Sequence, residues 1–210
     1  LSLVESGTGE RGIFNRQAAQ NQAAKNGRRD ATYEFGTNPC SEIILRPYQF
    51  CNLTEVVIRS TDTEQDLERK IAVATILGTL QATYTKFPYL RKVWQDNTDE
   101  ERLLGVSLTG IMDNPLTTTA NPELPALLER LRAVSVEVNK EWAGKLGIAV
   151  STAITAVKPS GTVSQLVNSA SGIHARHSEY YIRTVRGAYN DPLTQFMKDQ
   201  GIPWEPCAHQ

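Results

Sequence analysis

Long apolar runs, a secretory leader and an excess of positive charge are all missing from this sequence. No apolar run approaches the roughly 18 residues that cross a bilayer, and the first residues do not resemble a secretory signal. The 210 residues include 22 Lys and Arg against 23 Asp and Glu, for a formal net charge of -1. This balance disfavours a strongly basic nucleic-acid-binding surface. We therefore expect a cytoplasmic protein that binds neither membrane nor nucleic acid.

Cysteine is scarce, and the three that occur are Cys40, Cys51 and Cys207. An odd number without a secretory signal favours an intracellular protein with reduced thiols. In that setting a cysteine is either small buried filler or a catalytic, redox-active or metal-binding residue. The residues around each cysteine must decide between these roles.

The length and the beginning of the chain bear on its organisation. A hydrophobic content of 40% supplies one buried core, and the length suggests one domain or two. The first residue is Leu1, and about sixty mostly irregular residues precede the first long helix, more than a compact domain usually supports alone. We interpret residues 1–210 as one portion of a larger catalytic domain, from a longer or a split protein.

Apolar periodicity predicts three long helices, over residues 64–86, 99–111 and 122–146. Thr61 and Glu64 fit a capping box for the first helix, and the acidic residues 99–101 suit the first turn of the second. Asn121 and Gly147 fit the two ends of the third. Two helical stripes are predicted to be core: Leu67, Ile71, Ala74, Leu77 and Leu80, and Leu124, Leu127, Leu128, Leu131, Val134 and Val138.

Shorter elements are also expected. A polar, Ala-rich helix is predicted at residues 16–26, ended by Gly27. Strand-like runs occur at residues 43–45, 56–58, 152–157 and 180–185, and a further apolar run at residues 163–167 follows a turn. Because strands alternate with helices, the pattern favours the α/β class.

The first chemically informative segment runs from Asn38 through Cys40 to Glu42. If it is extended, these three side chains project to one face, about 6–7 Å apart. A thiol can act as nucleophile or hydrogen-atom donor, a carboxylate can accept a proton, and an amide can orient a hydroxyl. Spacing alone leaves two alternatives open. Cys40 is buried filler, or it joins Cys51, His174 and His177 in a zinc site, although eleven positions between the two cysteines exceed the usual spacing.

The second informative segment is the turn that follows the strand predicted at residues 152–157. Gly161 allows close approach of the backbone to a ligand. Backbone N–H groups and hydroxyls at such a turn can hold phosphate oxygens, although an ordinary β-turn has the same composition. The predicted phosphate-binding residues are Pro159, Ser160, Gly161, Thr162 and Ser164.

Two stretches of the sequence resemble the adenosylcobalamin-dependent class II ribonucleotide reductases. One is NPCSEIILRPYQFCNLTEVV, which contains both Cys40 and Cys51, and the other is AVKPSGTVSQLV with the following SGIHARHSEYYIRTVR. A third, GERGIFNR at residues 9–16, is similar to the family's GEPGIFNR loop, with Arg11 in place of Pro. The resemblance covers almost the whole chain and is specific at residues 7–58 and 150–186.

The resemblance implies a fold and a mechanism. The fold would be part of a ten-stranded α/β barrel whose finger loop carries the radical cysteine. Cys40 would hold the thiyl radical, Glu42 would be the general base, Asn38 its hydrogen-bonding companion, and Cys51 one of two reducing thiols. The cofactor would be adenosylcobalamin, and the substrate a ribonucleotide, a triphosphate by similarity to the monomeric class II enzymes.

Other parts of the family's machinery are not found in this sequence. Cys207 does not match the context of the second reducing thiol, and no C-terminal cysteine pair for a thioredoxin-like reductant is present. We therefore expect the N-terminal half of the reductase as a partner, and the isolated chain to be inactive. His174, Arg176 and His177 receive no catalytic role. The alternatives are a class I large-subunit piece, a non-catalytic fragment that binds nucleotide phosphate or a partner, and a small zinc module.

Overall fold

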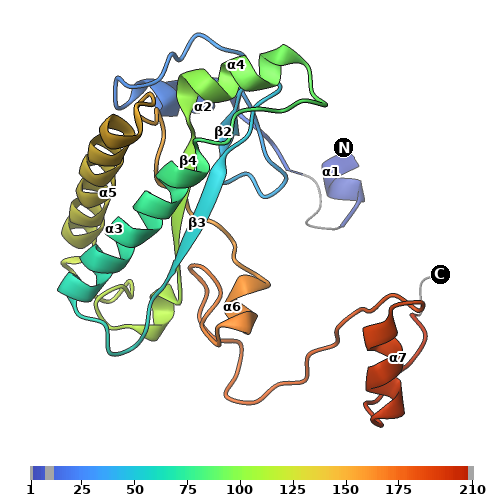
Figure 1. The fold of residues 1–210 in the computed structure, drawn as a ribbon. Helices are drawn as coiled ribbons and strands as arrows, with labels where there is room; N and C mark the ends of the chain where they lie inside the picture. Colours follow the sequence, from blue (N-terminus) through green and yellow to red (C-terminus); the bar gives the residue numbers. More distant parts are fainter. Residues whose placement is uncertain (1, 8–11, 208–210) are drawn as a thin grey trace. The chain divides into compact units, whose positions relative to one another are not determined.

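The computed structural model describes residues 2–7 and 12–207, and it divides the chain into two units. The first unit ends at Arg176 and the second begins at His177. Both units are drawn in Figure 1.

The centre of the first unit is a pair of parallel strands, β3 (Asn52–Val57) and β4 (Leu104–Thr109). Their register runs from Asn52 opposite Leu104 to Val57 opposite Thr109. Residues 152–157, predicted as a strand, pair with the other edge of β4 in one parallel bridge between Val106 and Thr155. The central strand β4 is thus bonded on both edges, which explains why it is almost wholly buried.

Two long helices cover this sheet, α3 (Glu64–Gln81) and α5 (Leu124–Leu146). They pack against each other, and α3 also lies on β3 and β4 (Figure 1). Both were predicted, although α3 ends at Gln81 rather than at residue 86, and the N-cap of α5 is Glu123 rather than Asn121. Gly147 ends α5 as predicted, in the left-handed conformation at φ 66°. The capping box of α3 uses Thr63 and Asp66 rather than Thr61 and Glu64.

The buried face of α3 differs in part from the predicted stripe. Leu67, Ile71 and Ala74 are in the core, but Leu77 and Leu80 are 55% and 38% exposed. The small residues Thr75, Gly78 and Thr79 are buried in their place. A Cβ on Gly78 would lie 3.1 Å from Leu104 Cδ2, so the last turns of the helix approach β4 too closely for large side chains. In α5 the structure buries Leu127 and Leu131, whereas Leu128 is 42% exposed.

The prediction of a helix at residues 99–111 is wrong. Helix α4 spans Lys92–Glu101, Arg102 turns the chain at φ 46°, and β4 follows. The apolar residues after Arg102 are buried on both faces, and periodicity cannot separate a short buried strand from a helix. Residues 99–101 therefore end a helix instead of beginning one.

The segment before β3 forms a helix and a short hairpin. Helix α2 (Arg16–Ala24) is capped by Asn15, whose side chain accepts from Ala18 N at 3.0 Å. Strands β1 (Gly36–Thr37) and β2 (Ile44–Leu45) pair antiparallel. A four-residue helix, α1 (Ser2–Glu5), precedes them.

The remaining elements are short. A 3-10 turn, η1 (Ile111–Asp113), follows β4. The run at residues 163–167 is helical as α6 (Val163–Leu166). In the second unit, residues 180–185 are not a strand but irregular and exposed, so that prediction is wrong. The helix there is α7 (Pro192–Asp199), capped by Asp191.

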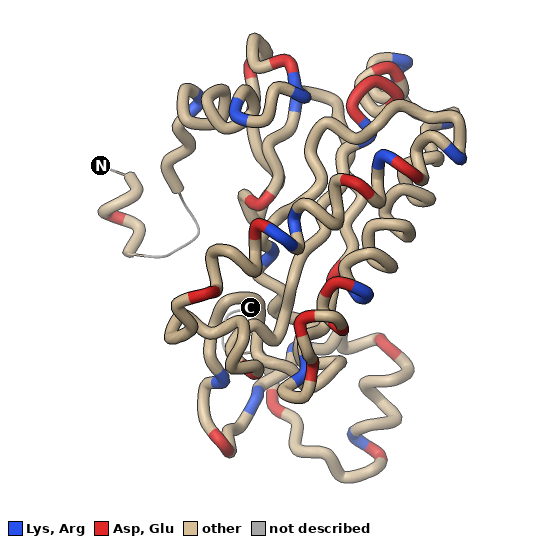
Figure 2. The backbone as a smooth tube through the Cα atoms, turned by 90° about the vertical axis from the view of Figure 1, so that its left-hand side faces the viewer, with Lys and Arg blue, Asp and Glu red and all other residues tan. Residues whose placement is uncertain are grey.

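Charged residues of both signs are interspersed along the helices rather than gathered into one-sign surfaces (Figure 2). None of the helices in the described residues is long and apolar enough to span a bilayer. The α/β class predicted from the alternation of elements is confirmed.

Candidate active site

The predicted cysteine segment forms the connection of the β1–β2 hairpin. Asn38 to Ser41 make a turn, in which Ser41 N donates to Asn38 O at 2.9 Å and Ser41 has φ 63°. The Asn38 side chain accepts from Ile43 N at 3.0 Å. The extended conformation assumed for Asn38–Glu42 is therefore wrong, because the turn and not the alternation of a strand sets the side-chain directions.

The turn nevertheless brings Glu42 to a polar cluster. Its side chain is 1% exposed, and Oε1 lies 3.0 Å from Lys158 Nζ. Burial raises the pKa of Glu42, but hydrogen bonds from Asn38, its own backbone and Lys158, together with the Lys158 charge, lower it, and the net pKa is below the ordinary value. Oε2 is buried without a well-formed hydrogen bond from any residue described. The carboxylate is thus charged, and Lys158 engages it through Oε1.

The two cysteines of the motif differ in exposure. Cys40 is exposed at the turn, Cys51 is half-buried just before β3, and both are free thiols. Burial raises the pKa of Cys51, the nearby Glu42 charge raises it further, and Lys158 and a backbone hydrogen bond oppose them. Cys51 is therefore held as a neutral thiol beside Glu42, while Cys40 is accessible from outside.

Lys158 interacts with Glu42 and with both cysteines of the motif. Its hydrogen bond to Glu42 is the main cause that raises its pKa; burial opposes this, and the charges of Glu42, Cys40 and Glu55 add to it. Its backbone N donates to Ser107 Oγ in β4 at 3.0 Å. Lys158 lies within the AVKPSGTVSQLV stretch, but no role was predicted for it from the sequence. A basic residue directly before a predicted phosphate turn was the signal that could have identified it.

The predicted phosphate turn directly follows Lys158. Ser160 has φ 53°, and its hydroxyl donates to Glu55 Oε2 at 2.8 Å. Ser164 is buried, and its hydroxyl donates to Gly161 O at 3.4 Å. Pro159, Gly161 and Thr162 are exposed. Two of the three predicted hydroxyls are thus engaged inside the protein, and the exposed face of the turn is made by the remaining three residues.

Glu55 is a second residue that sequence analysis did not identify. It lies in β3 and holds Ser160 through one oxygen, while Oε1 is buried without a partner among the described residues. Ser171 Oγ donates to Pro159 O and Ser160 O at 3.0 and 3.2 Å. The left-handed Ser160 is therefore fixed through both its side chain and its carbonyl oxygen. Because Glu55 looks like an ordinary strand residue, only the fold identifies it.

A close approach at Gly105 lets the hairpin connection lie on the sheet. A Cβ on Gly105 would be 2.5 Å from Leu53 Cδ2 and 2.9 Å from Ile43 Cδ1. Ile43 follows Glu42 directly and is buried. The absence of a side chain in β4 thus makes room for the residue next to the buried carboxylate.

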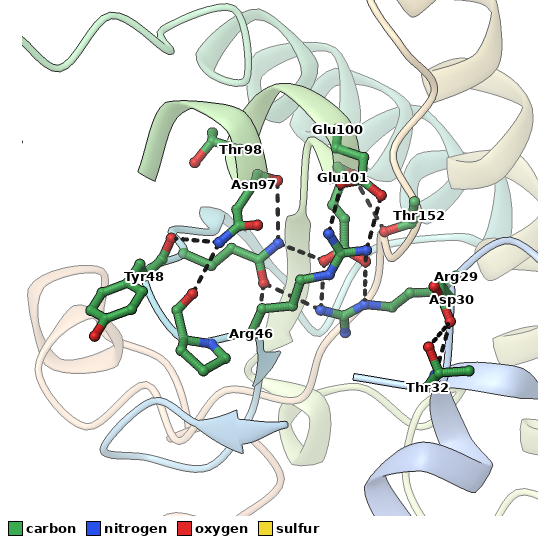
Figure 3. Close-up of polar contacts among 12 residues, drawn as sticks. Arg29, Asp30, Thr32, Arg46, Tyr48, Asn97, Thr98, Glu100, Glu101 and Thr152 are labelled. Atoms are coloured by element: carbon green, nitrogen blue, oxygen red, sulfur yellow. Dashed lines mark hydrogen bonds and ion pairs between the residues drawn. The ribbon is translucent and has the colours of Figure 1, made fainter. Parts of the chain in front are cut away.

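A buried ionic network supports the other end of the hairpin (Figure 3). Arg29 makes two hydrogen bonds of 2.8 Å to Glu101 and a third of 2.8 Å to Ile44 O in β2. Arg46 pairs with Glu100 at 2.8 Å and Glu101 at 3.2 Å, and Gln49 donates to Glu101 at 2.5 Å. The side chains of Arg29, Arg46 and Glu101 are 4%, 2% and 1% exposed. The network joins the segment before β1, the hairpin and α4.

Other predicted residues lie elsewhere. Arg176 pairs with Asp113 at 2.9 Å beside a hollow of about 280 Å³ that Cys40 does not line. His177 and Cys207 belong to the second unit. For the zinc alternative, no group of three or more potential ligands occurs among residues 2–7 and 12–207. Of the GERGIFNR loop, residues 9–11 lie outside the described part of the chain.

Three known proteins to which this chain is similar share one name. No family model matches the chain. It is 31% identical to the adenosylcobalamin-dependent ribonucleoside-triphosphate reductase of Lactobacillus gasseri over 94% of this chain and 30% of that protein. It is 30% identical to the protein of the same name from Lacticaseibacillus paracasei, over 98% of this chain and 31% of that protein. It is also 30% identical to the protein of that name from Euglena gracilis, over 93% of this chain and 26% of that protein.

A solved structure also matches. The crystal structure of a B12-dependent class II ribonucleotide reductase superposes with a TM-score of 0.56 at 25% identity, over 66% of this chain and 22% of that one. The chain thus spans between 26% and 31% of the length of the curated relatives named above.

Proposed function

From the premise that this chain belongs to the family of adenosylcobalamin-dependent class II ribonucleotide reductases, we propose that it supplies part of that enzyme's active site. The reaction is the reduction of a ribonucleotide to a 2'-deoxyribonucleotide. The relatives are named ribonucleoside-triphosphate reductases, and we propose a triphosphate as substrate here.

The observation that supports this proposal is the convergence of the motif residues on Lys158. Glu42 contacts its ammonium group directly, and Cys40 and Cys51 lie within its electrostatic reach. Asn38 is a hydrogen-bonding neighbour of Glu42. An exposed thiol, a half-buried thiol and a buried ionised carboxylate thus belong to one cluster, and the proposed reaction uses all three together with a second reducing thiol.

Each group has a defined part in the proposed reaction. Cys40, as a thiyl radical, takes the 3'-hydrogen atom of the ribose, and Glu42 accepts the 3'-hydroxyl proton. The 2'-hydroxyl leaves as water after protonation by a reducing thiol. Cys51 and a second thiol together give up two electrons and two protons and become a disulfide, with one proton leaving in the water and one hydrogen ending on C2'. Glu42 returns its proton to the 3'-oxygen, and Cys40 returns its hydrogen atom to C3'. The balance is one ribonucleotide and two thiols to one deoxyribonucleotide, one water and one disulfide.

Adenosylcobalamin, when bound, supplies the radical through its cobalt–carbon bond. The position of Cys40 fits such a source, because its thiol is exposed on a hairpin turn and open to approach from outside. Cys40 is therefore the residue of this chain that would meet the cofactor.

Four further assignments complete the proposal. The exposed side of the turn at Pro159, Gly161 and Thr162, positioned by Ser160 and Ser164, receives the substrate phosphates. The hairpin connection is the finger loop of a ten-stranded α/β barrel, to which residues 1–210 contribute the C-terminal portion. The N-terminal half of the reductase supplies the second thiol. A thioredoxin-like protein in the cytoplasm reduces the disulfide.

The test is reconstitution. The chain is combined with a polypeptide that supplies the rest of the reductase, together with adenosylcobalamin, a dithiol and a ribonucleoside triphosphate, and deoxyribonucleotide is measured by chromatography. We expect product from the mixture and none from the chain alone. Cys40→Ser and Cys51→Ser should abolish product, whereas the matched control Cys207→Ser should keep it. Product from the Cys40→Ser mixture, or none from the wild-type mixture, would refute the proposal.

A further inference from the structure

Lys158 joins the two motifs of the site, since it contacts Glu42 on the hairpin connection and directly precedes the phosphate turn. Its side chain is 28% exposed, whereas that of Glu42 is 1% exposed. We propose that Lys158 is a positioning residue for Glu42: by engaging Oε1 it keeps the buried carboxylate ionised and leaves Oε2 as the oxygen that takes the substrate's hydroxyl proton. This inference rests on the function proposed above for Glu42.

The two carboxylate oxygens have different surroundings. Oε1 accepts from Lys158 Nζ at 3.0 Å, whereas Oε2 is buried with no well-formed hydrogen bond from the described residues. A buried carboxylate oxygen without a donor is costly unless a ligand supplies one. A substrate hydroxyl supplies such a donor, and its proton would move to the oxygen that receives the hydrogen bond. The pairing by Lys158 therefore selects which oxygen acts.

The charge of Lys158 is needed because the site is buried. Burial alone would favour a protonated Glu42, and a protonated acid is no base. The other ionisable groups here do not help: Cys51 on the β3 side is held neutral, and the Cys40 and Glu55 groups that face Lys158 would add negative charge. Among the described residues that affect the pKa of Glu42, Lys158 supplies the positive charge, and Asn38 adds only a neutral hydrogen bond.

Contacts of the Lys158 backbone fix the position from which its side chain extends. Lys158 N donates to Ser107 Oγ at 3.0 Å, and Ser107 is buried in the central strand β4. On the other side, a Cβ on Gly172 would lie 2.9 Å from Lys158 O, so the chain there packs tightly against the lysine backbone. The side chain thus extends to Glu42 from an anchored position, as expected for a residue that orients another.

The experiment follows the titration of Glu42 directly. The 210-residue chain is labelled with 13C at the glutamate carboxyl carbon, Glu42 is assigned through Glu42→Gln, and its pKa is measured by NMR. Lys158→Met should raise the pKa of Glu42 by about 1 to 3 units, the usual effect of removing an adjacent opposite charge. Lys158→Arg should restore most of the difference. Lys145→Met, which removes a surface partner of Glu141, is the matched control and should leave Glu42 unchanged.

The reconstituted reductase gives the second readout. Because Glu42 must be ionised to act, a higher pKa in Lys158→Met should move the acid limb of the kcat profile to higher pH, with activity partly recovered above it. If instead Lys158→Met raises KM without moving the acid limb or the Glu42 titration, Lys158 is a substrate ligand only and the inference is wrong.

The two proposals fail in different ways. An unchanged Glu42 titration in an active reductase overturns the role of Lys158 alone. If Lys158→Met shifts the titration of Glu42 but the reconstituted mixture never forms deoxyribonucleotide, the proposed function is wrong. The pairing of Lys158 with Glu42 then still stands. Should Lys158→Met fail to fold, Lys158→Gln keeps a hydrogen-bond donor without the charge, and it must also raise the pKa of Glu42.

Discussion

At the residue scale, the reactivity of the Cys51 thiol depends on its neighbours. Burial is the main cause that raises its pKa, and the Glu42 carboxylate adds to it, against the opposing Lys158 charge. A neutral thiol suits a residue that gives up a hydrogen in the proposed reaction, because a thiolate has none to give. The same arrangement makes Cys51 a poor nucleophile near neutral pH.

We predict that Glu42→Gln increases the rate of Cys51 alkylation by iodoacetamide at pH 8. Removing the carboxylate charge lowers the pKa of Cys51, so more thiolate is present at that pH; a shift of one unit would give up to about tenfold more thiolate. The rate is followed by mass spectrometry at each cysteine. Glu137→Gln on α5 is the control, and it should not change the rate. An unchanged or slower reaction of Cys51 in Glu42→Gln would contradict the electrostatic coupling.

At the scale of elements, the hairpin is held by the ionic network centred on Glu101. This residue ends α4, yet its partners Arg29 and Arg46 lie before and after the hairpin. Arg46 also stacks on Tyr33, with its guanidinium carbon 3.6 Å from the ring centroid. A two-stranded hairpin with two residues per strand has little stability of its own, so its position depends on these contacts.

We predict that Glu101→Gln destabilises the chain by about 3–5 kcal/mol, because it leaves two buried guanidinium groups without their shared carboxylate. Urea unfolding monitored by circular dichroism measures the change. Glu141→Gln removes the exposed pair with Lys145 on α5 and should cost no more than about 0.5 kcal/mol. Equal stabilities of the two variants would show that the buried network does not hold the hairpin.

At the scale of the whole molecule, the chain consists of two units of unequal size, divided between Arg176 and His177. The first contains the sheet, its helices and every residue of the proposed site. The second contains α7, whose Lys198 lies over the rings of Tyr189 and Trp204. Between the division and α7, residues 177–191 are exposed and without helix or strand.

We predict that limited trypsin digestion cuts first at Arg183 or Arg186, since exposed irregular backbone is the preferred substrate of proteases. The large product should keep the helical circular dichroism of the first unit. Arg29 is also a trypsin site in the sequence, but it is buried and should be cut late. Intact mass spectrometry over time gives the order, and early cleavage at Arg29 would contradict the described core.

The accuracy of the structure predicted from the sequence differs from one element to the next. The helices observed at 64–81 and 124–146 were predicted, over 64–86 and 122–146, because their apolar stripes are long and Gly147 marks the end of the second. The strand after Arg102 was taken for a helix, and residues 180–185 for a strand, because short apolar runs carry no decisive periodicity. Within the site, Cys40, Glu42, Asn38 and Cys51 came from one local motif together with a family resemblance, and their roles remain predictions.

The sequence by itself determined which chemical groups are available: two thiols, a carboxylate and an amide within fourteen residues, Asn38 to Cys51. Only the tertiary structure decided which of them meet. The ammonium group of Lys158 is 116 positions away from Glu42 in the chain, and Glu55 reaches Ser160 across 105. Such pairs depend on β3, β4 and residues 152–157 lying side by side in parallel, and no local pattern encodes that arrangement, because parallel neighbours are joined through long crossovers.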